Sequence, residues 1–332
     1  MKTAAVSLVI PLYNAARHLE ACLASVAAQT FGDFECVCVD DGSTDASAAI
    51  AQARADRDAR FMVVRQANAG SSAARNKGMR LASAPVLAFL DADDLLHPQA
   101  LEVALAVMDR EGADVVSFRH ADVPDDFVLS APTRWEPERV ARRVTDAPFD
   151  DFFRVSRDKV KGDPVEIWLN LYRRAAISGI AFTEGVHYAE DVAFVLKVMH
   201  AIRRRASTSA TLLYHRDNPA SAINQGVTER YLRSHAQSAR DVREHFARRG
   251  LAPRQAERVR RYLAYMLYKA CVSQPLRKLR LPEERATLAC AQTLARELAA
   301  EGLLDAGCLG LRKRLAAACF LCGRTGLAKR LV

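Results

Sequence analysis

Apolar positions in the first two thirds of the chain follow two alternating spacings. Short apolar runs predict buried strands, and the stretches between them carry apolar residues at helical spacing, as at Leu19, Leu23 and Val26. The predicted strands are Val6–Ile10, Phe34–Val39, Phe61–Val64, Pro85–Leu90 and Val115–Phe118. This alternation predicts an α/β fold with a mostly parallel sheet and helices on both faces.

Helix signals also lie between these strands and dominate the last third of the chain. Thr44 or Asp45 is the expected cap of an alanine-rich helix, a second helix covers residues 72–81, and a third starts at Pro98. Beyond residue 225 the chain is predicted to be helical: one helix has a face formed by Tyr262, Tyr265, Met266, Lys269 and Ala270, and Glu283–Ala300 and Leu309–Leu331 are two more. We therefore expect an α/β domain over residues 1–220 and a helical C-terminal region over residues 221–332.

Polar residues follow several of the predicted strands at the point where each strand ends. The segments concerned are Pro11–Asn14, Asp40–Asp41, Gln66–Gly70 and Asp91–Asp94. In an open α/β sheet, ligands bind at the carboxyl ends of the strands. Acids as close as Asp91, Asp93 and Asp94 repel one another unless a hard divalent cation such as Mg²⁺ or Mn²⁺ lies between them. The alternative is that Asp94 caps the next helix and the other two acids are solvated.

Charge is unevenly distributed along the chain. The net charge is +9 at pH 7, yet residues 1–215 hold 25 Lys/Arg against 29 Asp/Glu. Residues 216–332 hold 23 against 10, a net of +13. A basic segment of this kind binds an anionic surface or is simply a solvated helical face, so peripheral attachment to an anionic membrane stays an open hypothesis.

Cysteine positions and the lack of long apolar runs indicate the compartment. The eight cysteines lie mostly in apolar runs, which is typical of free thiols in a reducing environment. The run Val6–Leu12 is short and contains Pro11, unlike a signal peptide, and no stretch has the roughly 20 apolar residues of a membrane span. The sequence therefore predicts a cytoplasmic protein that at most lies on the inner face of the plasma membrane.

The strand ends lack the glycine-rich motifs of dinucleotide-binding folds and P-loops. Several acids with Arg75 nearby suit a diphosphate held through a metal, with the guanidinium as a second clamp. Five segments in order resemble the motifs of glycosyltransferase family 2: Leu8–Asn14, Val39–Asp45, Asn68–Gly78, Leu90–Asp94 and Glu190–Asp191. The resemblance covers about residues 5–220 and implies the GT-A fold, which is Rossmann-like, with inverting transfer from a nucleotide-diphosphate sugar.

The resemblance also implies roles for individual residues. Pro11, Tyr13 and Asn14 would line the nucleotide pocket, and Asp41 would hydrogen-bond the base, which is uracil if the donor is a UDP-sugar. Arg75 would lie near base or phosphate. The segment Asp91-Ala92-Asp93 matches the D-x-D motif, with Asp93 as the metal ligand and Asp91 close to the ribose or sugar. Ser43 and Asp45 are expected as helix caps, and Asn76 and Gly78 as residues that shape turn and packing.

Direct displacement at a sugar requires a carboxylate base on an element separate from the metal site. Asp191, beside Glu190 as the alternative base, resembles the E-D motif of the family. Both acids also stand where a helix begins, which its dipole favours. Leu169 and Asn170 replace the Asn and Lys usual in the family's W-N-K-L-Y-R segment, which puts the acceptor or phosphate contact of that Lys in doubt. Trp168 is a sugar platform or a packing residue.

Three functions remain open at this point. The first is an inverting hexosyl- or hexosaminyltransferase that uses Mg²⁺ or Mn²⁺, a UDP-sugar and a glycan or lipid-linked acceptor for cell-surface polysaccharide. The second is a non-catalytic protein whose basic tail binds a nucleotide or a membrane; the tail lacks the interleaved aromatic and basic residues of nucleic-acid readers. The third is a nucleotidyltransferase, but Pro11–Arg17 is not the glycine-rich basic loop that such enzymes carry.

Overall fold

The computed structural model describes residues 4–332 except 131, 141, 159–165, 218–225 and 280–283. The chain forms two compact units. The first comprises Met1–Glu184 and Phe194–Pro219, and the second comprises Gly185–Ala193 and Ala220–Val332. The boundary predicted between residues 220 and 221 falls outside the described residues.

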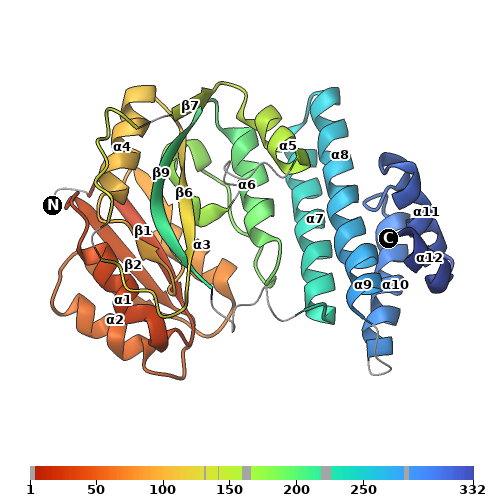
Figure 1. The fold of residues 1–332 in the computed structure, drawn as a ribbon, viewed down its shortest axis with the longest axis horizontal. Helices are drawn as coiled ribbons and strands as arrows, with labels where there is room; N and C mark the ends of the chain where they lie inside the picture. The colour runs from red at the N-terminus through yellow and green to blue at the C-terminus, as the bar shows by residue number, and fades with distance from the viewer. Residues whose placement is uncertain (1–3, 131, 141, 159–165, 218–225, 280–283) are drawn as a thin grey trace. The chain divides into compact units, whose positions relative to one another are not determined.

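A mixed β-sheet forms the centre of the first unit (Figure 1). Its strand order is β3-β2-β1-β4-β8-β6-β9-β5, and β7 pairs with β9. The strands are β1 (Val6–Leu12), β2 (Phe34–Asp40), β3 (Phe61–Arg65), β4 (Val86–Phe89), β5 (Leu95–Leu96), β6 (Val115–Val123), β7 (Arg142–Thr145), β8 (Asn170–Arg173) and β9 (Arg205–Arg216). Strands β1 to β4 pair in parallel, as the strand–helix alternation predicts.

The other half of the sheet departs from simple alternation. Strand β8 lies between β4 and β6 and is antiparallel to both, so β4 and β6 run in the same direction. Strand β9 is parallel to β6. The carboxyl ends of β1, β2, β4, β6 and β9 therefore lie along one edge of the sheet, which is where parallel-strand folds bind ligands.

Helices cover both faces of this sheet (Figure 1). They are α1 (Ala16–Ala27), α2 (Ser47–Ala55), α3 (Ser71–Leu81), α4 (Ala100–Glu111), α5 (Pro148–Asp158) and α6 (Glu190–Ala201). Helix α1 buries Leu19, Leu23 and Val26, as its spacing predicts. Helix α3 approaches β1 so closely that a Cβ atom on Gly78 would lie 2.2 Å from Val9 Cγ1. The packing role expected for Gly78 is confirmed, because a larger residue has no room there.

The starts of α2 and α4 differ slightly from their sequence signals. Helix α2 begins at Ser47 after Ala46, so neither Thr44 nor Asp45 occupies the cap position. Asp45 instead accepts hydrogen bonds from the Ser47 and Ala16 backbone N–H groups, at 2.9 and 3.0 Å, and joins the first turns of α1 and α2. Helix α4 begins at Ala100, after a turn in which Ala100 N donates to His97 O.

The second unit is helical, apart from the residues that precede α6. Its elements are α7 (Glu229–Arg249), α8 (Pro253–Tyr268), the π-helical turn Lys269–Ser273, α9 (Gln274–Lys278), α10 (Arg285–Ala300), the 3-10 turn Ala306–Cys308, α11 (Leu311–Leu321) and α12 (Thr325–Leu331). No helix in the described part of the chain is long and apolar enough to span a membrane.

One helix prediction is wrong in this unit. The segment Leu309–Leu331 is two helices, because Gly323 adopts a φ of 78° and ends α11. The Arg324 N–H donates to Cys319 O at 2.8 Å and the Gly323 N–H donates to Phe320 O at 3.0 Å. These two bonds form a Schellman motif, which satisfies the last carbonyls of a helix and stops it.

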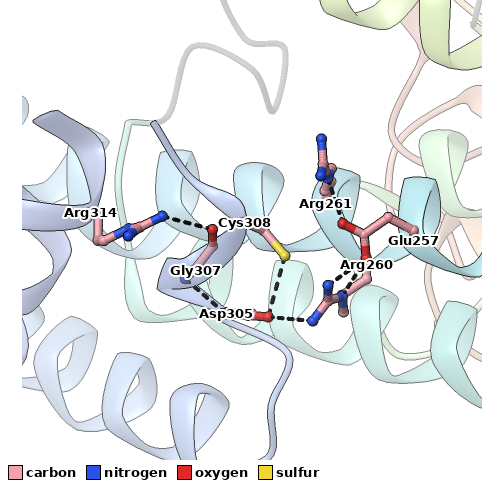
Figure 2. A network of polar contacts seen from close by, with 7 residues as sticks. All are labelled: Glu257, Arg260, Arg261, Asp305, Gly307, Cys308 and Arg314. Carbon is pink, nitrogen blue, oxygen red and sulfur yellow. Dashed lines mark hydrogen bonds and ion pairs between the residues drawn. The ribbon is translucent and has the colours of Figure 1, made fainter. Parts of the chain in front are cut away.

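A polar network joins α8 to the start of α11 (Figure 2). Arg260 Nη1 donates to Asp305 Oδ2 at 2.9 Å, and Asp305 Oδ1 accepts from the Gly307 N–H at 2.8 Å. Arg314 Nη2 donates to the Gly307 carbonyl at 3.0 Å. The network holds the turn before α11 and the first turns of α11 in a fixed geometry.

Candidate functional site

The loops after β1 and β2 are joined by reciprocal hydrogen bonds. The Asn14 N–H donates to Ser43 Oγ at 3.1 Å, and Asn14 Oδ1 accepts from the Thr44 N–H at 2.9 Å. Asn14 itself has a φ of 49°, a left-handed conformation that Asn tolerates better than most residues. Tyr13, its neighbour, leaves 54% of its surface exposed. The structure thus fixes the backbone of the predicted nucleotide pocket and leaves one aromatic ring open beside it.

Asp41 organises the loop that leads into α3. The residue is buried, and its Oδ1 accepts from Gln66 Nε2 at 2.7 Å and from the Ala69 N–H at 2.9 Å. Its Oδ2 accepts from the Gly70 N–H at 2.8 Å, at the start of the helix. The expectation of a contact between Asp41 and the base stays a prediction. In the structure its carboxylate already anchors residues 66–70.

Arg75 and Asp91 form a charge-assisted pair at the end of β4. Arg75 Nη2 lies 2.8 Å from Asp91 Oδ1, and the guanidinium lies 5.6 Å from the centre of the Phe182 ring. The arginine side chain is buried, whereas the Asp91 side chain is about one third exposed. Because the guanidinium is held on two sides, it presents a fixed positive charge beside the partly open D-x-D segment.

Asp94 differs in kind from its two neighbours. The carboxyl is buried and its Oδ1 accepts from the Arg216 N–H at 3.0 Å. Burial, followed by repulsion from Asp91 and Asp93, raises the pKa of Asp94 to about 9. The Asp94 carboxyl is therefore protonated at neutral pH.

The carboxylates that follow β4 suit a hard divalent ion whose remaining ligands are substrate phosphates and water. Within the described ranges there is no group of three or more His, Cys, Asp or Glu side chains that could hold a metal ion by themselves. Mg²⁺ is commonly bound by one or two carboxylates, with substrate phosphates and water completing the shell. Asp93 and the partly exposed Asp91 match that pattern.

An aromatic cluster supports the end of β4. Phe89 meets the rings of Tyr172, Phe182 and Phe194 edge-on at 5.8, 5.3 and 5.9 Å between centroids. Phe182 and Phe194 stack at 3.9 Å. Asn76 on α3 fixes the Phe182 backbone in both directions, through its Nδ2 and Oδ1. The acid-bearing turn that follows β4 therefore rests on a rigid apolar base.

Glu190 and Asp191 begin helix α6 and belong to the second compact unit, whereas the other candidate site residues belong to the first. Ala189, directly before them, has a φ of 62°. Among the described residues other than glycine, Ala189 and Asn14 are the two with positive φ. An alanine in this conformation is strained by about 1–2 kcal/mol. Ala189 directly precedes the two acids that the sequence singles out as candidate bases.

Trp168 stacks on His215, with ring centroids 5.2 Å apart and an interplanar angle of 6°. His120 meets the indole edge-on, and Asp122 Oδ1 lies 3.2 Å from His215 Nδ1. One face of the indole is therefore covered by the protein, which favours the packing alternative over a sugar platform. Arg216 is buried and its Nη1 donates to Asp125 O at 2.7 Å.

The sequence comparisons decide the family. The model of glycosyl transferase family 2 matches residues 7–178. The chain belongs to this family. Relatives in the family include the putative glycosyltransferase EpsH of Bacillus subtilis, 32% identical over 239 residues, which cover 70% of this chain and 67% of EpsH. The uncharacterized glycosyltransferase EpsJ of the same organism is 30% identical over 218 residues.

The family match concerns mainly the first unit. The aligned residues cover 65% of this chain and 62% of EpsJ, so the chain spans about three fifths of the length of that relative. Among solved structures, S. aureus TarS 1–349 in complex with UDP-GlcNAc is similar, with a TM-score of 0.73 and 17% identity over 98% of this chain and 90% of that one. The likeness establishes the GT-A fold with a helical C-terminal region.

Sequence reasoning assigned no individual role to three residues that shape the candidate site. Gln66 binds the Asp41 carboxylate, and its position at a strand end was the available signal. Phe182 lies against Arg75, and no local pattern marks it. Cys22 Sγ donates to Asp91 O at 3.6 Å, and burial, followed by the nearby Asp94, raises the pKa of this thiol well above its usual value. Helical spacing indicates that Cys22 is buried but does not indicate that its thiol contacts the Asp91 backbone.

Proposed function

We propose that this family 2 enzyme is a metal-dependent inverting glycosyltransferase. The donor is a UDP-sugar, and the acceptor is a hydroxyl of a glycan or lipid-linked precursor of cell-surface polysaccharide. The observation that supports this best is the end of β4, where the buried Arg75 holds the partly exposed Asp91 beside Asp93. TarS, which shares the fold, was solved with UDP-GlcNAc, and this supports a uridine nucleotide as donor.

Donor binding is assigned to the loops at the carboxyl ends of the strands. Pro11, Tyr13 and Asn14 line the nucleotide pocket, and the exposed Tyr13 ring is suited to stack on a base. Asp41, through the loop it anchors, positions the base. Ala92, between Asp91 and Asp93, is small enough to let the sugar approach them.

The leaving diphosphate requires compensation of growing negative charge. Arg75 supplies a fixed cation at the site, and Asp93, with Asp91 beside it, would hold Mg²⁺ or Mn²⁺. The ion, when bound, supplies further neutralisation of the diphosphate. Asp91 also accepts from Arg75, which orients its carboxylate and leaves the second oxygen for the ribose or the sugar.

Proton transfer from the acceptor is assigned to Asp191, with Glu190 as the alternative base. The acceptor O–H proton moves to the carboxylate as the acceptor oxygen bonds to the anomeric carbon. The bond between that carbon and the diphosphate oxygen breaks on the opposite face, so the anomeric configuration inverts. The strained Ala189 sets the direction in which the first turn of α6 presents both acids.

A titration of nucleotides tests the donor site. We expect UDP to bind in the presence of Mn²⁺ and to lose most of its affinity in EDTA, with GDP and dTDP binding more weakly. Substitution of Asp93 by Asn should remove the metal dependence, and Asp56→Asn, an exposed acid on the C-terminal side of α2, is the matched control. If none of the three nucleotides bound with or without metal, the proposal would be wrong.

Location follows from the acceptor class. We propose that the enzyme works in the cytoplasm, where nucleotide sugars are made, and attaches peripherally to the inner face of the plasma membrane when its acceptor is lipid-linked. The net charge of +13 over residues 216–332 supports attachment to an anionic surface.

A further inference from the structure

Helix α11 presents an apolar stripe to solvent. Leu311 and Leu315 are 71% and 46% exposed, and Ala318 is also exposed. These residues are spaced i, i+4 and i+7, so they lie on one side of the helix. We call them the α11 stripe. Leu327 on α12 is 47% exposed. Large apolar side chains at this exposure and spacing mark a surface that binds something apolar.

The opposite side of α11 is firmly packed, so the stripe is not the outcome of a frayed helix. Ala316, Ala317 and Phe320 are buried. Lys313 Nζ lies 4.3 Å from the centre of the Tyr265 ring on α8, and Arg296 Nε on α10 donates to Leu321 O at 2.8 Å. Together with the network of Figure 2, these contacts fix which side of α11 faces solvent.

The charges on the segment that carries the stripe have one sign. Residues 306–332 contain six basic residues and no acidic one. Arg312 and Arg314 flank the stripe, and each donates one hydrogen bond to a backbone carbonyl, of Leu331 and of Gly307, while the side chain remains exposed. Lys329 and Arg330 on α12 are exposed as well. The surface therefore combines leucines with exposed basic side chains.

This combination selects one occupant. Protein interfaces are depleted of charge at their centre, and nucleic acids offer little to an aliphatic stripe. An anionic bilayer offers acyl chains to the leucines and headgroups to the guanidinium and ammonium groups, whose stems reach along the apolar face. We propose that α11 and α12 form an interfacial surface that binds anionic lipid headgroups and inserts Leu311 and Leu315. The inference rests on the peripheral attachment proposed above and names its residues.

Vesicle flotation with the whole 332-residue chain tests the proposal. The wild-type protein should float with mixed phosphatidylcholine and phosphatidylglycerol vesicles and stay at the bottom with phosphatidylcholine alone. High salt should weaken the binding, because the attraction of surface charges is screened. If the wild-type protein stayed at the bottom with the anionic vesicles as well, the proposal would be overturned.

Two variants separate the leucines from the charges. Leu311→Asp with Leu315→Asp should lower vesicle binding roughly tenfold or more, because two apolar anchors become anions. Lys329→Gln with Arg330→Gln should lower it by a smaller factor. Val128→Asp is the matched control, since Val128 is 77% exposed but lies in the first unit, and it should float as the wild type does. Circular dichroism verifies that each variant is folded.

Other occupants give different results. If the stripe joined two copies of the chain, the double leucine variant would change the sedimentation coefficient and leave flotation unchanged, which overturns the proposal. A drop in flotation for Val128→Asp equal to that of the leucine variant would overturn it too. Metal-dependent UDP binding, measured on the same variants, stays at wild-type level if only the membrane surface is lost. Failure of the donor site is therefore seen separately.

Discussion

The carboxyl edge of the sheet and the C-terminal surface of α11 and α12 are built in opposite ways. At the sheet edge, polar groups from distant parts of the sequence are buried and bound to one another, as Asp94 is to Arg216, 122 residues away. On α11, neighbouring residues of one helix expose leucines to solvent with cations beside them. A chemical site needs fixed positions, and a lipid surface needs only area and charge. We therefore expect single substitutions at the sheet edge to abolish activity. Membrane binding by α11 and α12 should instead decrease gradually as residues are replaced.

The largest effect is expected at Asp93. Asp93→Asn removes the anion assigned to the metal, and we expect kcat for sugar transfer to fall by roughly a thousandfold or more. Vesicle flotation should not change, because Asp93 lies in the first unit. The measurement is transfer of a labelled sugar to an acceptor by the variant and the wild type. Near-normal turnover of Asp93→Asn would show that the sheet edge tolerates substitution, which contradicts the contrast with α11 and α12.

Asp191→Asn should be the next most damaging change. Loss of a general base lowers kcat by roughly 10²–10⁴-fold. The affinity for UDP with Mn²⁺ should be unchanged, which separates this residue from Asp93. Steady-state transfer kinetics and nucleotide titration give the two readouts. Glu190→Gln is the comparison: a greater loss there than at Asp191 would exchange the two assignments.

A structural change where α3 packs on β1 sharpens the contrast further. Gly78→Ala should destabilise the protein by about 1–3 kcal/mol, because its Cβ would lie 2.2 Å from Val9 Cγ1. Urea unfolding measures the loss, and Val9→Ala in the same chain should recover part of it.

Gly326 in α12 is the comparison for Gly78. No atom lies within 4 Å of a Cβ built on Gly326, so Gly326→Ala should stabilise that helix by about 0.5–1 kcal/mol. Equal losses of stability at Gly78 and Gly326 would contradict the close approach of α3 to β1.

The smallest expected effect concerns pH and Glu35. Burial raises the pKa of this carboxyl, but hydrogen bonds from Ser7 Oγ and from the Ser83 and Ala84 N–H groups outweigh burial, so its pKa is lowered overall. Its contribution to stability is present above the unfolded-state pKa of about 4.3 and is lost as the pH falls through the lowered folded-state value.

Unfolding free energies at neutral pH and at about pH 3 measure this term. It should be well under about 1 kcal/mol, because solvent screens a partly exposed group. Glu35→Gln should remove this part of the pH dependence, and an unchanged slope in that variant would assign the dependence to other carboxyls.

The sequence by itself determined the parallel half of the fold and much of the site. Apolar runs and helical spacing are local properties, so β1 to β4, α1 and α3 follow from them. The placement of acids at the ends of strands also follows from the chain order. An amphipathic surface is already indicated by the order of Leu311, Arg312, Arg314 and Leu315 in the sequence. Only the structure shows that the two leucines are exposed to solvent.

Tertiary structure decided the rest, because the deciding contacts link residues far apart in sequence. Strand β8 joins the sheet between β4 and β6 through antiparallel pairing that no local pattern encodes. Asp94 holds its proton because folding buries it beside Asp91 and Asp93, whereas the sequence shows only three similar acids. Asp41 becomes an anchor for the loop at residues 66–70 only when β2 and β3 lie side by side. Burial and long-range hydrogen bonds change what a side chain does, and both exist only in the folded chain.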